Sequence, residues 1–124
     1  MNTITLDKLH VPNATLQAWP LPAELVIAGD PEASGTVLSK SDDARKVRGI
    51  WSCTPGQFRW NWTYDETVFM LSGRATVALS SGRVVELEPG DLAFFSSGEE
   101  SVWTIHETLR KSFHADSARP MRNG

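Results

Sequence analysis

The sequence contains one cysteine and three histidines in 124 residues. A single cysteine cannot form an internal disulfide, which fits a reducing compartment. No apolar run approaches the roughly 18 residues of a membrane-spanning helix, and the first residues lack the apolar core of a secretory signal. We therefore expect a cytoplasmic protein that makes no contact with a membrane.

The net charge is small, and several common catalytic motifs are absent. The formal charge of −3 provides no basic field to attract a phosphate backbone, so we expect no nucleic-acid partner. The chain also lacks a glycine-rich phosphate loop, a serine nucleophile elbow and any cluster of cysteine and histidine. These absences leave binding or catalysis in a pocket as the functions to consider.

Short strands joined by tight turns dominate the stretch from Phe58 to Gly98. Ser81-Gly82 is a two-residue loop typical of a β-hairpin. Glu88 to Asp91, with its Pro-Gly centre, predicts a further turn before an apolar strand at Leu92 to Phe95. The length fits one domain with one core, so the sequence predicts an all-β fold.

The flanking segments complete this prediction. Further strands are expected at Glu24 to Ala28, Gly35 to Leu38, Lys46 to Cys53, Val102 to Ile105 and Leu109 to Phe113, with Ser39 to Lys46 as a surface loop or single helical turn and His106-Glu107 as a connection. Residues 23–115 would then form the barrel, with residues 116–124 as a tail.

Residues 1–22 read as an extended arm, because they carry three of the seven prolines and no regular period. Four apolar residues of the arm need burial, either on their own barrel or on a partner subunit: Leu6, Leu9, Leu16 and Trp19. Since a small barrel also has exposed sheet edges, we expect a homodimer.

An aromatic row that ends in a carboxylate is the most distinctive pattern in the chain. Its members share one parity and would lie on one side of a strand: Phe58, Trp60, Trp62, Tyr64 and Glu66. Such rings either fill a barrel core or line a cavity. The sequence leaves both alternatives open.

Two spacings in this region resemble the motifs of the cupin superfamily, small β-barrels of the jelly-roll type. Glu66 and Gly73 keep the end of the first motif, while Gly90, Ser96 and Gly98 keep the frame of the second. The histidines that usually bind metal are missing. Trp60 and Trp62 occupy the positions of the histidine pair in the first motif, and Ser101 occupies the position of the histidine in the second. A finer resemblance, to the ureidoglycine aminohydrolase subfamily, is carried by Trp51, Glu66, Gly73, Gly90-Asp91, Trp103 and Arg110-Lys111.

The resemblance implies an inward-facing pocket and a set of positions that would line it. We predict as ligand-binding residues Trp60, Trp62, Tyr64, Glu66, Ser101 and Trp103. Glu66 is the candidate catalytic residue, because burial would disfavour its ionised form unless a donor or cation pairs with it, which is how a general base is tuned. The alternative is a solvated turn carboxylate beside Asp65.

A divalent metal needs three or four converging ligands, and of the family's ligand positions only Glu66 keeps one. We expect His106 to point outward, His114 to be structural, and Cys53 to be an inert packing residue. No metal or other cofactor is therefore predicted.

The neighbouring Arg110 and Lys111 are expected to be surface or interface charges, although alternation would let one of them point inward and counter Glu66. Two functions follow from the sequence. The first is a cupin that binds a small metabolite in an aromatic pocket without metal. The second is an enzyme resembling ureidoglycine aminohydrolase that acts on a small nitrogenous metabolite, with Glu66 as metal ligand or general base.

Overall fold

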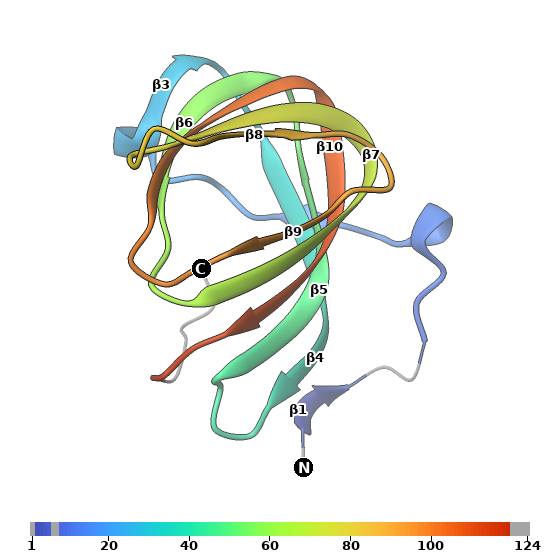
Figure 1. Ribbon diagram of the computed structural model, residues 1–124. Coiled ribbons are helices and arrows are strands. Elements are labelled where there is room, and N and C mark those ends of the chain that lie inside the picture. Colours follow the sequence, from blue (N-terminus) through green and yellow to red (C-terminus); the bar gives the residue numbers. More distant parts are fainter. Residues whose placement is uncertain (1, 6–7, 120–124) are drawn as a thin grey trace.

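The computed structural model describes residues 2–5 and 8–119 and shows a β-sheet that curls into a small barrel (Figure 1). The predicted all-β fold, a small barrel of the jelly-roll type, is confirmed. The strands are β1 (Asn2–Thr5), β2 (Gln17–Ala18), β3 (Val26–Gly29), β4 (Ala33–Ser41), β5 (Lys46–Cys53), β6 (Gly56–Asn61), β7 (Asp65–Leu79), β8 (Val84–Leu87), β9 (Leu92–Phe95) and β10 (Glu100–Asp116). Helix is limited in this part of the chain to two 3-10 turns, η1 (Val11–Asn13) and η2 (Ala23–Leu25).

Strand β10 is the centre of the sheet, because it pairs antiparallel with β5, β6 and β7. Its first half lies beside β6 and its second half beside β5, with an irregular register against β7 between Ile105 and Lys111. The prediction of two strands separated at His106-Glu107 is therefore wrong. The polar residues there lie on a bulge, which exposes them without reversing the chain.

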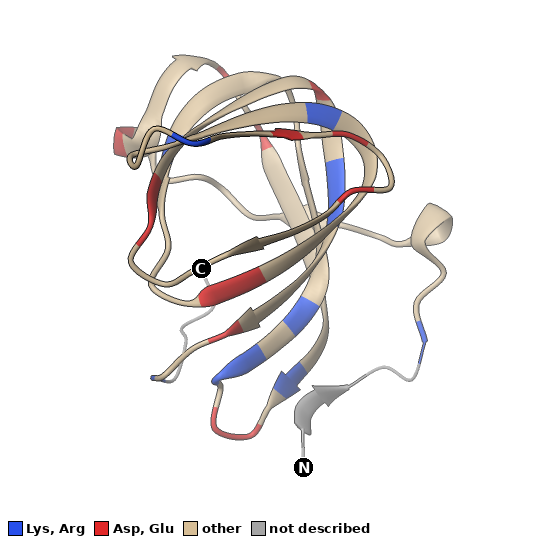
Figure 2. Cartoon of the chain, in the orientation of Figure 1, with Lys and Arg blue, Asp and Glu red and all other residues tan. Residues whose placement is uncertain are grey.

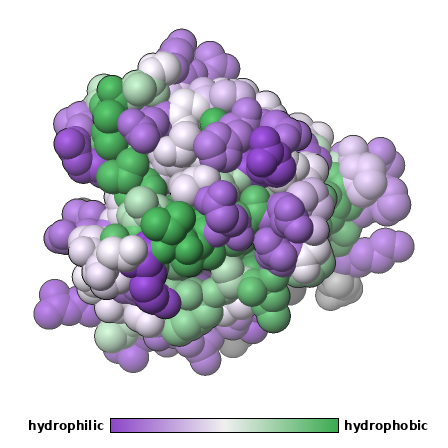
Figure 3. Space-filling model, turned by 45° about the horizontal axis from the view of Figure 1, so that its top comes forward, coloured by the Kyte–Doolittle hydropathy of each residue, from purple (hydrophilic) through white to green (hydrophobic). Residues whose placement is uncertain are grey.

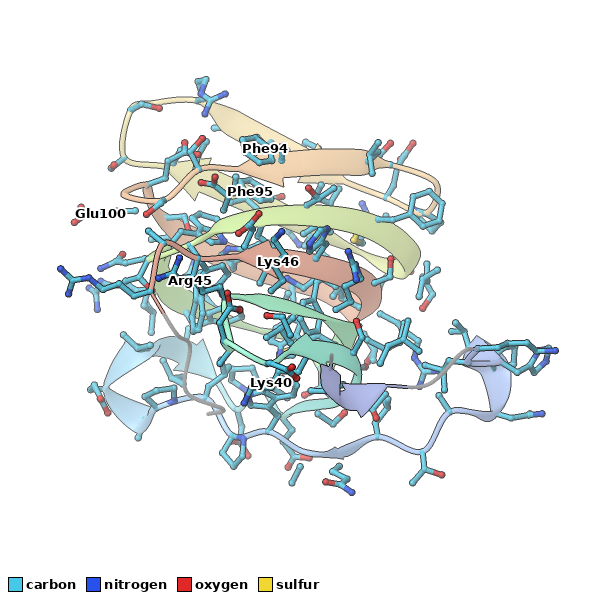
Figure 4. The ribbon with its side chains drawn as sticks, turned by 90° about the horizontal axis from the view of Figure 1, so that it is seen from below. Lys40, Arg45, Lys46, Phe94, Phe95 and Glu100 are labelled. Atoms are coloured by element: carbon cyan, nitrogen blue, oxygen red, sulfur yellow. The ribbon has the colours of Figure 1, made fainter. Side chains whose placement is uncertain are left out.

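The turns follow the sequence signals closely. Gly82 donates its backbone N–H to the carbonyl of Leu79 at 2.9 Å and closes the β7–β8 hairpin as predicted. The predicted loop from Ser39 to Lys46 is shorter in the structure, since β4 continues to Ser41 and β5 begins at Lys46. Figure 4 shows Lys40, Arg45 and Lys46 around this turn.

Charged residues of both signs occur on the strands and turns (Figure 2). Across the described part of the chain, no helix is long and apolar enough to span a membrane. The predicted compartment is not tested by this observation and stays a prediction.

The N-terminal arm lies on its own barrel. Its two strands, β1 and β2, both pair with β4, and Trp19 donates its backbone N–H to the carbonyl of Ala33 at 2.9 Å. The Trp19 ring packs edge-on against Phe113, with centroids 6.2 Å apart. Leu6 lies outside the described residues.

Some apolar side chains remain exposed on the outside of the barrel. On adjacent strands β7 and β9, Phe69 is 42 %, Leu92 72 % and Phe94 60 % exposed, whereas Phe95 points inward and is buried. Figure 3 shows hydrophobic residues exposed among hydrophilic ones on the side that carries β8 and β9. The structure contains one chain, so the homodimer stays a prediction.

Gly73 holds β7 close to the bulge of β10, and we predict that Gly73→Ala destabilises the fold. Its φ is +82°, and a Cβ there would stand 2.2 Å from the Thr108 carbonyl oxygen. Strain and backbone displacement together should lower the free energy of unfolding by about 2–4 kcal/mol, measured by urea denaturation.

Gly82→Ala is the matched control. Gly82 also has a positive φ, of +98°, but a Cβ there meets no heavy atom within 4 Å. Only backbone strain should apply, at about 1 kcal/mol. Equal losses in the two variants would contradict the importance of the close approach.

Candidate functional site

A cavity of about 320 Å³ opens in the interior of the barrel. Half of its lining residues are aromatic. The lining as a whole comes from the arm, from strands β5, β6, β7 and β10, and from the bend between β6 and β7. The lining consists of Trp19, Pro20, Leu21, Pro22, Val47, Trp51, Phe58, Trp60, Tyr64, Glu66, Trp103, Lys111, Phe113 and Ala115. The arm segment 19–22 therefore forms part of the cavity wall.

The aromatic row spans β6, a bend and the start of β7 rather than one strand. Four of its five members line the cavity: Phe58, Trp60, Tyr64 and Glu66. Trp62 does not. Its side chain is 1 % exposed and stacks on Phe95 with centroids 4.4 Å apart. The row thus serves both as cavity lining and as core.

Trp62 lies behind the carboxylate of the row. Its indole Nε1–H donates a hydrogen bond of 2.9 Å to Glu66 Oε1. An indole N–H needs a partner when it is buried, and the carboxylate supplies it. Trp62 therefore orients Glu66 and is not part of the cavity surface.

The two predicted residues from β10 differ in position. Trp103 lines the cavity, and its Nε1–H has no hydrogen-bond partner among the described residues. Ser101 is buried and donates its hydroxyl to the Trp60 carbonyl at 2.7 Å, and it is not among the cavity-lining residues. Trp103 thus lines the cavity with its ring while its N–H stays buried, whereas Ser101 ties β10 to β6.

Glu66 is only 4 % exposed, so the alternative of a solvated turn carboxylate is wrong. The neighbouring Asp65 takes that position, since it is exposed and accepts a hydrogen bond from the Ser97 N–H at 2.9 Å. Strand alternation explains the difference between the two carboxylates, because adjacent side chains on β7 face opposite sides of the sheet.

Lys111 lies inside the barrel, contrary to the expectation from the sequence. It is buried, and its Nζ donates to Glu66 Oε2 at 2.8 Å. The expectation that Arg110 and Lys111 are both surface charges is therefore wrong for Lys111. The signal was its position between Leu109 and Phe113 on an alternating strand. Arg110 faces the other side and donates to the Val11 carbonyl at 3.1 Å.

The ammonium of Lys111 also lies over two indole rings of the cavity. Its Nζ is 4.9 Å from the centroid of Trp51 and 5.0 Å from that of Trp103. These are cation–π distances, at which the ring face attracts a cation. The charge is therefore balanced by one carboxylate and two aromatic faces.

Burial raises the pKa of two other titratable groups. Desolvation raises the pKa of the Tyr64 hydroxyl well above its usual value, and the Glu66 carboxylate raises it further. Desolvation also raises the pKa of the Cys53 thiol to about 11. Cys53 is fully buried in the core, so the predicted inert packing role fits its environment.

The histidines do not line the cavity. His106 is exposed, as predicted, and bonds to the Thr76 hydroxyl at 2.7 Å. His114 lies in a groove on the outer face of the sheet, where desolvation and the nearby Arg48 lower its pKa. His10 is exposed in the arm.

The donor set does not fit the divalent metal that most active cupins hold. Throughout residues 2–5 and 8–119, no three side chains of His, Cys, Asp or Glu converge as metal ligands would. The carboxylate at the family position is already bonded to an ammonium, which a cation would have to displace. We therefore derive no chemistry through a metal.

We predict that removing either partner of the buried pair destabilises the fold. Glu66→Gln leaves an unpaired ammonium, and Lys111→Met leaves an unpaired carboxylate, so each should lower the free energy of unfolding by about 3–5 kcal/mol in urea denaturation. The condition under which Glu66→Gln would stabilise the protein, a buried carboxylate without a cation, is not met.

The double variant Glu66→Gln, Lys111→Met is the control, because it removes both charges together. Its loss should be smaller than the sum of the two single losses, which a double-mutant cycle measures. Additive losses would show that the two charges do not interact.

The comparisons with known proteins agree with this fold. Residues 40–113 match the model of the EutQ-like cupin domain family, whereas no curated protein matches the chain. Among solved structures, a protein of unknown function from Pseudomonas syringae pv. tomato has a TM-score of 0.76 at 22 % identity, over 83 % of this chain and 45 % of that one. The chain thus spans less than half the length of that relative.

Two further structures are similar over most of the chain. The EutQ protein of Clostridium difficile has a TM-score of 0.70 at 18 % identity, over 90 % of this chain and 86 % of that one. Ectoine synthase from P. lautus has a TM-score of 0.60 at 14 % identity, over 68 % and 63 %. These likenesses show the fold alone, and the finer resemblance to ureidoglycine aminohydrolase stays a prediction. The family match confirms the cupin resemblance, and the chain belongs to the EutQ-like cupin domain family.

Proposed function

We propose that the barrel cavity binds a small metabolite without a divalent metal. The observation that carries this proposal is the aromatic-lined cavity of about 320 Å³ with Glu66 and Lys111 in its lining. Ligand pockets typically enclose roughly 300–1,000 Å³ and combine an apolar lining with a few placed polar groups. This cavity has both properties.

The aromatic lining supports binding in preference to plain core packing. Trp51, Trp60 and Tyr64 are only partly buried, although each has a large apolar face that would gain from contact with a ligand. Core residues of the same barrel, such as Trp62 and Phe95, are packed face to face without free space between them. The rings that line the cavity are thus partly accessible, whereas these core rings are not.

Catalysis by Glu66 is the alternative function. A carboxylate in the cavity lining is what an enzyme resembling ureidoglycine aminohydrolase would use as a general base. Both oxygens, however, already accept hydrogen bonds, from Trp62 and Lys111. Taking a proton from a substrate would require Glu66 to give up its ion pair, so the geometry supports binding better than proton abstraction.

We predict that the neutral fluorescent probe N-phenyl-1-naphthylamine binds saturably in the cavity, because its aromatic rings match the indole lining. Trp51→Ala should weaken its affinity about tenfold, since one aromatic face and its apolar area are lost. Fluorescence titration measures both constants. Leu92→Ser is the control, because Leu92 belongs to the exposed outer patch. If Leu92→Ser abolished probe binding and Trp51→Ala did not weaken it, the probe would bind outside the cavity.

We also predict that divalent metals do not stabilise the protein. Zn²⁺, Mn²⁺ or Ni²⁺ near micromolar concentration should leave the melting temperature unchanged. A metal that did bind, at a concentration a hundred times its Kd, would add about 2.7 kcal/mol to the free energy of unfolding. Differential scanning calorimetry and elemental analysis of the purified protein measure this. A stoichiometric metal that is lost in Glu66→Gln would contradict the metal-free proposal.

A further inference from the structure

We propose that the cavity selects molecules without net charge that carry a planar amide-type group, a carbonyl next to an N–H, and that it discriminates against both organic cations and organic anions. This inference rests on the proposed binding function and specifies its ligand class. It follows from the charge, the burial and the remaining hydrogen-bonding capacity of Glu66 and Lys111 in the cavity lining.

The described residues of the lining carry no net charge. The ionisable side chains among them are Tyr64, Glu66 and Lys111. Glu66 and Lys111 are paired at 2.8 Å and both are buried, and the Tyr64 hydroxyl is kept neutral by its surroundings. A charged ligand would therefore lose its hydration without gaining an unpaired counter-ion.

A cationic ligand meets a second obstacle. Aromatic cavities commonly recognise cations through their ring faces, but the ammonium of Lys111 already lies about 5 Å from the ring centroids of Trp51 and Trp103. A second cation at these faces would be repelled by the first. The faces of Trp51 and Trp103 are in this sense already occupied by a cation of the chain itself.

An anionic ligand meets the opposite obstacle. Among the described residues of the lining, its one cationic partner is Lys111, whose ammonium is bonded to Glu66 Oε2. A ligand carboxylate that bonded to this ammonium would lie next to the Glu66 carboxylate. Two neighbouring negative charges in a buried site repel each other strongly. Binding would require the buried pair to open.

A neutral amide meets neither obstacle and matches the capacity that remains. An ammonium has three donors, and Lys111 makes one hydrogen bond to a described residue. Each oxygen of Glu66 accepts one hydrogen bond, which leaves further lone pairs. The carbonyl of an amide can accept a hydrogen bond from Lys111 and its N–H can donate to Glu66, while an aromatic ring attached to the amide stacks on the indoles.

The test compares three probes that share one ring and differ in charge: benzamide, benzoate and benzylammonium. Titration of ¹⁵N-labelled protein, followed through the indole N–H signals of its five tryptophans, gives the three affinities. We expect benzamide to bind about tenfold more tightly than either ion, since one uncompensated charge is avoided. The Trp103 signal, assigned with Trp103→Phe, should shift with benzamide.

Single variants of the pair should change the preferred charge in opposite directions. Lys111→Met leaves the carboxylate and should shift the preference to benzylammonium, whereas Glu66→Gln leaves the ammonium and should shift it to benzoate. Arg74→Met is the control, because Arg74 belongs to an exposed pair with Glu107, and it should keep the order of the unmodified protein. A merely structural pair would not reverse the charge preference.

The order of affinities in the unmodified protein decides the proposal even where a single variant does not fold. Tighter binding of benzoate or benzylammonium than of benzamide overturns the charge selection and leaves the proposed binding function in place. Binding of N-phenyl-1-naphthylamine without binding of any of the three probes also overturns it. If neither that probe nor the three bind, the proposed function fails as well.

Discussion

The buried ion pair between Glu66 and Lys111 links the two longest strands of the barrel, β7 and β10. Removing two charges from water is unfavourable unless the pair is well aligned and its other hydrogen-bonding groups are satisfied. Here the Trp62 N–H satisfies one carboxylate oxygen, and two indole faces surround the ammonium. The positions of these aromatic residues are therefore coupled to the pair.

The same pair separates this chain from the metal-binding pattern of its superfamily. Where most active cupins use imidazoles and a carboxylate around an ion, this chain has indoles and a carboxylate around an ammonium. The cation is then part of the polypeptide and cannot exchange. Lys111 neutralises Glu66 without offering the open coordination position through which a metal activates a substrate. The missing histidines and the buried Lys111 are therefore both consistent with the proposed binding of a ligand without metal.

The shape of the cavity depends on two departures from regular structure. The bulge in β10 lets one strand pair with β6 along its first half and with β5 along its second half, so that Trp103 and Lys111 both reach the cavity. The arm then adds Trp19 to Pro22 to the cavity wall. Gly35 makes this possible, because a Cβ at that position would stand 2.5 Å from the Trp19 ring.

The amino-acid sequence by itself determined the all-β class and the turns at Ser81-Gly82 and Glu88 to Asp91, whereas the inward direction of Glu66 was implied by the family resemblance. These features depend on local physics: glycine and proline set turn geometry, and alternation sets the face of a side chain. Alternation allowed one residue of the Arg110-Lys111 pair to point inward, but it did not show that either one does, or what it would contact.

Only the tertiary structure decided which side chains meet. Lys111 and Glu66 are separated by 45 residues, and their contact depends on the register between β7 and β10, which no local pattern encodes. The bend after β6 likewise turned Trp62 from a predicted ligand position into a support behind Glu66. Continuity of β10 through its polar centre was missed for the same reason, because a bulge and a turn have similar composition and differ in the partners that the rest of the barrel supplies.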